Sequence, residues 1–245
     1  MPYKPLIEPM YLVEMESVSS TNDQARKLAK NGYPSGVIIW AHEQTAGRGR
    51  QGNSWVSIPG NLFMTIILRP HVNVAQIGQL SLLAGVALAN VLGSFVPASN
   101  DIRLKWPNDL YINGKKAAGI LVETESQGML SVPWAVVGIG VNIVSAPENA
   151  TSLFDIGIST YEAGHVLEFL SKEIHILVKQ WEQYGFAPIR DAWMERAFKL
   201  GETITARLPK GELTGIFEGL DKTGALLLTA TDGARHTVNA GEVFV

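Results

Sequence analysis

Apolar residues follow two periods along this chain, and each period predicts a different kind of element. Nearly unbroken runs rich in β-branched and aromatic residues occur at 37–41 and 62–68, and they predict buried strands. Between 74 and 95 apolar residues recur every three to four positions, which predicts one long helix. Polar residues interrupt this stretch repeatedly, so we interpret it as a core helix and not as a membrane span.

Shorter signals predict the other elements of the first 199 residues. One short helix should end at Lys30, and a capping box at 159–162 should start another that ends near Gly185. A further helix is predicted at 188–199, with its proline in the first turn. The turn sequence Asn113–Gly114 should join the predicted strands at 102–105 and 118–123. Strands are predicted at four more places: 11–13, 102–105, 118–123 and 134–143.

The pattern changes past Leu200. Five short alternating strands are predicted between 204 and 245, separated by tight-turn sequences that include Pro209–Lys210, and they suggest a small barrel. We therefore predict an α+β protein: a mixed-sheet catalytic domain with packed helices at 1–199 and a small SH3-like β-barrel at 200–245.

Composition narrows the class of protein. The 245 residues are 46% hydrophobic and 18% charged, which is ordinary for a globular protein with a sizeable core. The net charge of −3 does not favour nucleic-acid binding through a broad basic surface. The absence of cysteine excludes disulfides and thiolate chemistry. No signal peptide is evident at the start, so we expect a soluble cytoplasmic protein without membrane contact.

The segment 44–52, Gln-Thr-Ala-Gly-Arg-Gly-Arg-Gln-Gly, carries the most chemical information. Its glycines allow close backbone approach to a ligand, and its arginines suit carboxylate or phosphate oxygens. The spacing also fits the dinucleotide pattern G-x-G-x-x-G, but that pattern needs a helix next and an acidic residue about 20 positions later. A strand-like run follows instead, and no Asp or Glu occurs from 44 through 100. The segment therefore indicates a loop that wraps an anion.

Three other segments carry weaker signals. Lys105 ends a predicted strand before Trp-Pro-Asn-Asp, where an ammonium group suits the stabilisation of charge on a transferring group. Taken alone, a solvated surface lysine is the more frequent explanation. Small residues at 116–119 and alternating glycines at 138–142 would let strands pass close to a ligand, but they also suit tight packing.

The order of these segments resembles the biotin protein ligases, in the short form without an N-terminal DNA-binding domain. The resemblance begins at Ser20-Thr21-Asn22 and continues through 44–52, 105–109, 116–123 and 138–142 to the terminal strands. It implies a catalytic domain of the type shared with class II aminoacyl-tRNA synthetases. It also implies that ATP and Mg²⁺ convert biotin to biotinyl-5′-AMP, and that a lysine of a biotin carboxyl carrier protein then takes the biotinyl group.

The resemblance also implies roles for individual residues. Lys105, Arg50 and Arg48 would be catalytic, gathering the carboxylate and phosphates and neutralising their charge. The expected biotin contacts are Ser20, Thr21, Asn22, Gln44, Gly47, Arg48, Lys105 and Gly119. The expected ATP or adenylate contacts are Arg48, Gly49, Arg50, Trp55, Lys105, Asn108 and Asn142. Trp55 would stack on adenine, although a core tryptophan is an equal alternative. No metal ligand is identified, and Mg²⁺ would be held mainly through the phosphates.

One departure and several alternatives stay open. Asn53 stands where the family commonly has another arginine, which leaves one cation fewer for retaining the adenylate. Lipoate or octanoate ligases and transferases of the same fold are the nearest enzymatic alternative, and a non-catalytic biotin sensor is the alternative from another class. Only about 19 residues precede Ser20, so we expect no operator binding. A homodimer is compatible with the family.

Overall fold

The computed structural model describes residues 4–7, 10–125, 132–208 and 211–244, so the predicted turn at Pro209–Lys210 and Val245 lie outside the described residues. The helices and strands of the first part are β1 (Lys4–Ile7), β2 (Met10–Val18), α1 (Thr21–Lys30), β3 (Val37–Gln44), β4 (Leu62–Leu68), α2 (Gln79–Phe95), β5 (Ile102–Lys105), β6 (Asp109–Ile112), β7 (Lys115–Thr124), β8 (Ala135–Val141), α3 (Ala163–Tyr184) and α4 (Ala187–Met194). Short 3₁₀ turns lie at Arg50–Gly52, Val74–Gln76 and Phe154–Ile156. The second part contains β9 (Thr203–Leu208), β10 (Gly211–Leu220), β11 (Leu226–Ala230), β12 (Arg235–Val238) and β13 (Glu242–Phe244).

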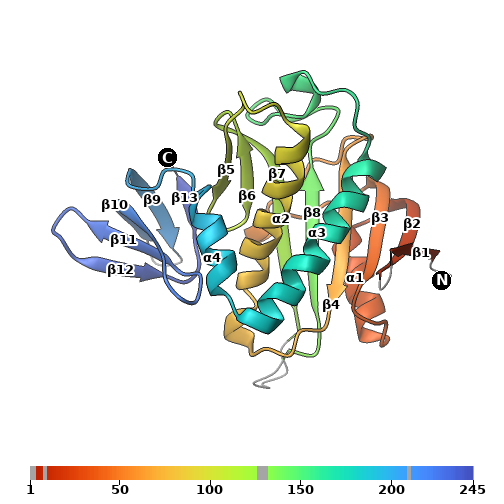
Figure 1. Cartoon of the computed structure of the whole chain (residues 1–245), viewed down its shortest axis with the longest axis horizontal. Helices are drawn as coiled ribbons and strands as arrows, with labels where there is room; N and C mark the ends of the chain where they lie inside the picture. Colours follow the sequence, from red (N-terminus) through yellow and green to blue (C-terminus); the bar gives the residue numbers. More distant parts are fainter. Residues whose placement is uncertain (1–3, 8–9, 126–131, 209–210, 245) are drawn as a thin grey trace.

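The predicted α+β class is confirmed (Figure 1). One eight-stranded sheet has the order β1-β2-β3-β4-β8-β7-β6-β5, and a separate five-stranded sheet has the order β12-β11-β10-β9-β13. The pair β2 and β3 is parallel, joined by α1, whereas the other described pairs are antiparallel. The large sheet is therefore mixed, as predicted.

Alternation along the strands divides the core between the two faces of the large sheet. Ile38 faces the larger cluster, which includes the buried sides of α2 and α3, while its neighbours Val37 and Ile39 pack with Ala25 and Ala29 of α1. Helices α2 and α3 thus cover one face and α1 covers part of the other (Figure 1). The uncovered part of the second face is where the cavity described below opens.

Among the described residues, the stretch Val74–Phe95 is long and apolar enough to span a membrane, with a mean hydropathy of 1.5. However, 72% of the 18-residue apolar window within it is buried inside the fold, and α2 packs against α3 and α4. It is a core helix, as the interrupting polar residues indicate.

Two predicted boundaries in the first part are wrong. The turn Asn113–Gly114 leads into β7, which contains the predicted strand at 118–123, but the strand before it is β6 and not the one at 102–105, because β6 forms there with Leu110 and Ile112 fully buried. The capping box at 159–162 is also misplaced. Glu162 itself is the N-cap, and its backbone N–H donates to His165 Nδ1 over 3.3 Å. The preceding residues are not helical, and Tyr161 among them stacks on Phe95 of α2.

The last helix is shorter than its pattern predicts. It ends at Met194, five residues before the predicted end at Lys199. The reason is a tertiary contact: Leu104 of β5 donates its N–H to the Arg196 carbonyl over 2.7 Å and accepts from Phe198 N–H over 2.9 Å. These sheet-like bonds take the backbone groups that another helical turn would use.

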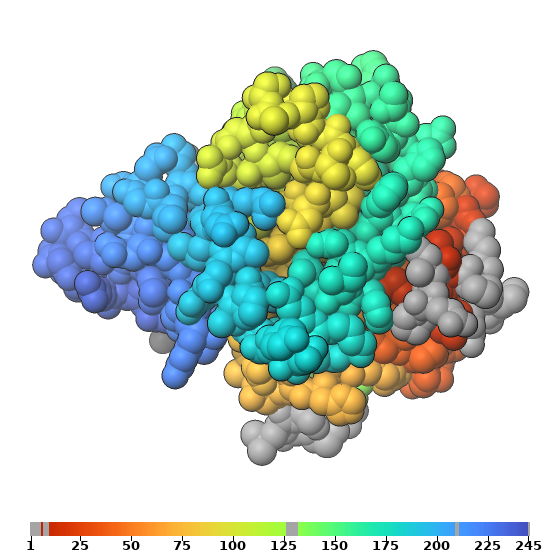
Figure 2. Space-filling view, in the orientation of Figure 1, coloured from red at the N-terminus to blue at the C-terminus, as the bar shows by residue number. Residues whose placement is uncertain are grey.

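The C-terminal strands form a lobe at one end of the molecule (Figure 2). The lobe is anchored where Trp106 Nε1 donates to the Gly224 carbonyl over 3.0 Å and where Trp193 meets Phe217 edge-on. A division of the chain at residues 199 and 200 stays a prediction.

Candidate functional site

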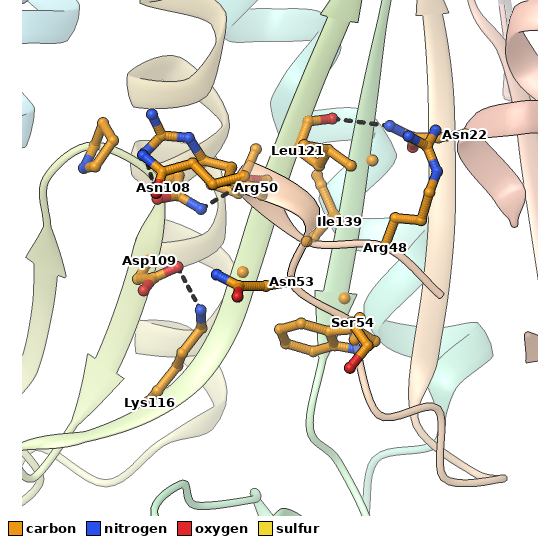
Figure 3. A pocket seen from close by; sticks show the side chains of 18 of the residues that line it. Asn22, Arg48, Arg50, Asn53, Ser54, Asn108, Asp109, Lys116, Leu121 and Ile139 are labelled. Atoms are coloured by element: carbon orange, nitrogen blue, oxygen red, sulfur yellow. Dashed lines mark hydrogen bonds and ion pairs between the residues drawn. The ribbon is translucent and has the colours of Figure 1, made fainter. Parts of the chain in front are cut away.

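A cavity opens on the face of the large sheet that α1 covers only in part (Figure 3). Its floor is made by Gly119 of β7 and by Gly138 and Gly140 of β8. A Cβ atom at Gly138 would overlap the side-chain amide of Asn22, and one at Gly140 would lie 2.6 Å from the Trp55 ring. These glycines therefore make room for side chains that lie directly on the sheet.

The glycine–arginine segment closes over this floor as a small hairpin. Gly49 N–H donates to the Asn53 carbonyl over 2.7 Å, and Trp55 N–H donates to the Gly47 carbonyl over 2.9 Å. Gln51, between them, has a φ of 54°, in the left-handed region. The hairpin thus carries Arg50 at its tip, with Arg48 and Trp55 on its two strands near the open end.

Trp55 lies on the floor of the cavity, and not in the hydrophobic core. Its ring lies over Gly119 and Gly140, and the Lys116 ammonium is 5.6 Å from the ring centroid. Its Nε1 is buried without a hydrogen-bond partner. Of the two interpretations of this residue, a tryptophan that faces a ligand fits the geometry, because one ring face lies on the glycines and the opposite face can stack on an aromatic base.

Arg50 and Lys105 occupy one end of the cavity, which we call the cationic end. Arg50 Nη1 donates to Asn108 Oδ1 and to the Gly241 carbonyl, each over 3.2 Å. Lys105 Nζ donates to the Tyr111 hydroxyl over 3.2 Å. Burial lowers the pKa of both cations from their ordinary values, while the nearby carboxylates oppose that shift. Desolvated cations of this kind act strongly on an incoming anion.

The cationic end also contains residues that the sequence analysis did not assign to the site. Lys116 Nζ pairs with Asp109 Oδ1 over 2.7 Å (Figure 3). Glu242, from the C-terminal lobe, lines the cavity and acts electrostatically on Arg50 and Lys105. Lys116 lies in a segment singled out for its small residues, so its charge was the missed signal. Nothing in the pattern around Glu242 indicated that a separate lobe would reach the cavity.

The opposite end, which we call the amide end, is formed where β2 passes into α1. Ser20, Thr21 and Asn22 are buried there, each no more than 4% exposed. Gln44, at the end of β3, accepts from Thr21 N–H over 2.9 Å and donates to Ser57 Oγ over 3.3 Å. Parallel pairing of β2 with β3 brings these segments together. Closely spaced donors and acceptors suit a compact polar ring such as a ureido group.

Arg48 lies at the amide end, where its guanidinium and the Asn22 amide share Glu123 Oε2. It donates to Glu123 Oε1 and Oε2 over 3.0 and 2.8 Å, and to Asp23 Oδ1 over 2.8 Å. The hydrogen bond that Arg48 donates to Glu123 is the largest cause of its raised pKa, and desolvation by burial opposes it. The structure thus places the Arg48 charge with two carboxylates, and leaves its buried Nε without a partner.

Most of the predicted site residues line this one cavity: Ser20, Thr21, Asn22, Gln44, Arg48, Gly49, Arg50, Trp55, Lys105, Asn108 and Gly119. Two do not. Gly47 supports the hairpin from behind, where a Cβ would meet the Trp55 carbonyl at 2.7 Å. Asn142 is buried, and its Nδ2 donates to the Thr151 carbonyl over 3.2 Å, so its amide is used inside the fold.

The described residues contain no cluster of three or more metal-ligating side chains of His, Asp or Glu. The carboxylates of Asp109 and Glu242 lie among the cations of the cationic end. This donor set fits Mg²⁺ held by one or two carboxylates together with substrate phosphates, the arrangement that Mg²⁺ prefers.

Comparison with known proteins identifies the family. Residues 14–142 match the biotin/lipoate A/B protein ligase family, and residues 199–245 match the biotin protein ligase C-terminal domain. The chain belongs to the biotin/lipoate A/B protein ligase family. It is 42% identical to a biotin–[acetyl-CoA-carboxylase] ligase of Paracoccus denitrificans, over 92% of this chain and 96% of that protein. It is 36% identical to the bifunctional ligase/repressor BirA of Bacillus subtilis, over 94% of this chain and 73% of that protein.

Solved structures agree with the sequence matches. A biotin protein ligase from Aquifex aeolicus in complex with biotin and ATP superposes with a TM-score of 0.80 and 29% identity, over 95% of this chain and 97% of that one. A ligase from Leishmania major in complex with biotinyl-5-AMP gives a TM-score of 0.66 and 28% identity, over 96% of this chain and all of that one. The fold predicted from the resemblance is therefore confirmed for both parts of the chain.

Proposed function

We propose that this chain activates biotin with ATP to form biotinyl-5′-AMP and then transfers the biotinyl group to a lysine of a biotin carboxyl carrier protein. The chain is a ligase enzyme of the biotin type, as its relatives at 42% identity and its structural neighbours indicate. The observation that carries the proposal is the single cavity with an amide end for an uncharged polar ring and a cationic end for phosphates.

Activation brings two anions together. A biotin carboxylate oxygen attacks the α-phosphorus of ATP, the bond to the bridging oxygen breaks, and pyrophosphate leaves. Arg50, Lys105 and Lys116 line the cavity where this charge develops, and they offset the repulsion between the reactants. Mg²⁺, when bound with ATP, would neutralise phosphate charge, with Asp109 and Glu242 as the nearby oxygen ligands.

Transfer needs a neutral amine and a dry mixed anhydride. The amine of the carrier lysine attacks the acyl carbon, the bond to the AMP oxygen breaks, and an amide, AMP and a proton result. The hairpin at 47–55 would cover the anhydride and exclude water until the carrier arrives. Its position over the glycine floor supports this role.

Other parts of the proposal are finer than the family alone establishes. We propose that the acceptor is the carrier domain of an acetyl-CoA carboxylase or a related carboxylase, and that the protein acts in the cytoplasm. No membrane partner and no specific DNA contact is expected, consistent with the net charge of −3. A gel shift with specific duplex binding would contradict the second expectation. A homodimer is also proposed, and light scattering with and without ligands would test it.

Biotin-dependent exchange of labelled pyrophosphate into ATP tests the activation step. Wild type should exchange with biotin and Mg²⁺ but not with lipoate, and Lys105→Ala should lose about 10²–10³-fold, as for removal of one preorganised charge donor. Arg190→Ala is a suitable control, because Arg190 is a half-buried cation outside the cavity. Exchange with lipoate alone would favour the lipoate branch, whereas biotin binding without exchange would favour a sensor.

A further inference from the structure

A chain of hydrogen bonds connects the amide end of the cavity to the arginine of the hairpin. Its members are polar side chains from five different elements, and we call them the pocket-to-loop chain: Gln44, Thr21, Thr65, Asn22, Glu123 and Arg48. Every link joins side-chain atoms, and no link is longer than 3.1 Å. The chain joins the proposed biotin head-group contacts to the proposed closing loop without a gap.

Thr65 is the centre of this chain and an unusual residue for its place. It is the one polar residue of β4, whose seven residues are all buried, and it is itself 0% exposed. Valine would fill the same volume without a hydroxyl to satisfy. The Thr65 hydroxyl lies 2.7 Å from Asn22 Oδ1 and 2.8 Å from Thr21 Oγ1, between two residues of the amide end. Packing alone does not account for that position.

The chain can adopt two hydrogen-bond patterns, because each hydroxyl has a single proton. Thr65 can donate to Asn22 Oδ1 or to Thr21 Oγ1, and Thr21 can donate to Gln44 Oε1 over 3.1 Å or to Thr65. A polar ligand that forms hydrogen bonds with the Thr21 hydroxyl or the Gln44 amide excludes one of these two hydrogen-bond patterns. This choice decides whether Asn22 Oδ1 accepts a hydrogen bond from Thr65. The Nδ2 atom of the same amide donates to Glu123 Oε2 over 2.8 Å.

Glu123 connects the Asn22 amide to the hairpin, because it accepts hydrogen bonds from both Asn22 and Arg48. Its two carboxylate oxygens take both terminal nitrogens of Arg48, the bidentate geometry that holds a guanidinium most firmly. Arg48 also pairs with Ser54 in an isolated β-bridge across the hairpin. Fixing Arg48 therefore also restrains its bridge partner Ser54 and the adjacent Trp55.

We propose that Thr65 and Glu123 are positioning residues that couple occupancy of the amide end to closure of the 47–55 hairpin. The inference rests on the proposed function, since biotin is the ligand expected at the amide end. Neither residue needs to touch the reacting atoms. Their role is to make the hairpin close more firmly when the head group is bound.

Tryptic cleavage at Arg48 and Arg50, followed by mass spectrometry, measures hairpin closure directly. Saturating biotin should slow cleavage of the wild type by about tenfold, a coupling typical of linked sites. Thr65→Val and Glu123→Gln should each reduce that protection at least fivefold at saturating biotin, whereas Thr65→Ser should keep it because the hydroxyl remains. Glu125→Gln is the matched control, since Glu125 lies two residues further along and pairs with Lys30 instead.

The double variant decides whether the two residues act together. Thr65→Val combined with Glu123→Gln should lose no more protection than either single variant, because contacts in one network are not additive. Additive losses, or full protection in Thr65→Val, would overturn the proposal, as would loss of protection in Thr65→Ser. If Thr65→Val does not fold, Glu123→Gln at the rim of the cavity still decides. Failure of the wild type to bind biotin in calorimetry would instead refute the proposed function.

Discussion

Gly140→Ala should lower the efficiency with which the enzyme uses ATP, because the added methyl group displaces the Trp55 ring. A Cβ at residue 140 would lie 2.6 Å from Cε2 and 2.7 Å from Cζ2 of Trp55. Optimal carbon–carbon separations are about 3.5–4.0 Å, so the ring must move by roughly 1 Å. A misplacement of that size in a positioning group can cost about 10²-fold in rate. We therefore expect kcat/KM for ATP in pyrophosphate exchange to fall by about that factor.

Biotin binding should change little in this variant, because the Asn22 amide lies over Gly138, whereas the Trp55 ring lies over Gly140. Isothermal calorimetry with biotin alone checks this. Gly93→Ala is the control: residue 93 is exposed on α2, and a Cβ there meets no atom within 4 Å. That substitution should leave activity intact and stabilise the helix by about 0.5–1 kcal/mol.

A double-mutant cycle identifies the cause. In a Trp55→Ala background the added methyl group has no ring to displace, so Gly140→Ala should then cost less than about threefold. An equal loss in both backgrounds would refute the reasoning, because the damage would then come from the sheet and not from the indole.

Three further predictions follow from buried or hydrogen-bonded groups. Burial lowers the pKa of Lys105, so exchange should decline as pH rises at values below the ordinary 10.5. Over that interval the unfolded state binds more protons, so stability should rise with pH, and Lys105→Met should raise Tm while abolishing activity; a lowered Tm would contradict this. Asn61→Ala removes the acceptor for the N–H groups of Ile143 and Val144 and should cost about 1–3 kcal/mol in thermal unfolding, with exchange retained below the midpoint. Desolvation raises the pKa of Asp221, but hydrogen bonds from Thr223, Gly224 and Ala225 together outweigh it, so the pKa lies below its ordinary value. The stability that the Asp221 carboxylate contributes is therefore lost as pH falls through its lowered pKa. Asp221→Asn should show a smaller drop in Tm between pH 7 and pH 3 than wild type.

Local pattern determined the secondary structure wherever one physical signal dominated. The strand at 62–68 is a continuous apolar run, and its predicted bounds equal those of β4 because a fully buried strand needs no other information. The helix predicted at 74–95 was also clear from its period, but α2 begins only at Gln79, after a separate 3₁₀ turn at Val74–Gln76. Prediction failed where distant backbone decided the outcome, as when β5 takes the Arg196 and Phe198 groups and ends α4 early.

The candidate site divides in the same way. Glycines and arginines at 47–50 predicted an anion-binding loop, because backbone freedom and positive charge are properties of the residues themselves and can be recognised in the sequence. The order of segments also supplied the resemblance that family membership now confirms. Asn142, in contrast, points its amide at Thr151, which no pattern in its own strand could indicate.

Only the tertiary structure decided which charges meet. Arg48 and Arg50 are two residues apart, yet one is held by Asp23 and Glu123 while the other reaches Asn108 and the Gly241 carbonyl. Sequence determined that cations, amides and glycines were present, since composition and spacing fix the available chemistry. Folding determined their partners, because hydrogen bonds and ion pairs depend on distances of a few ångströms between segments as many as 191 residues apart.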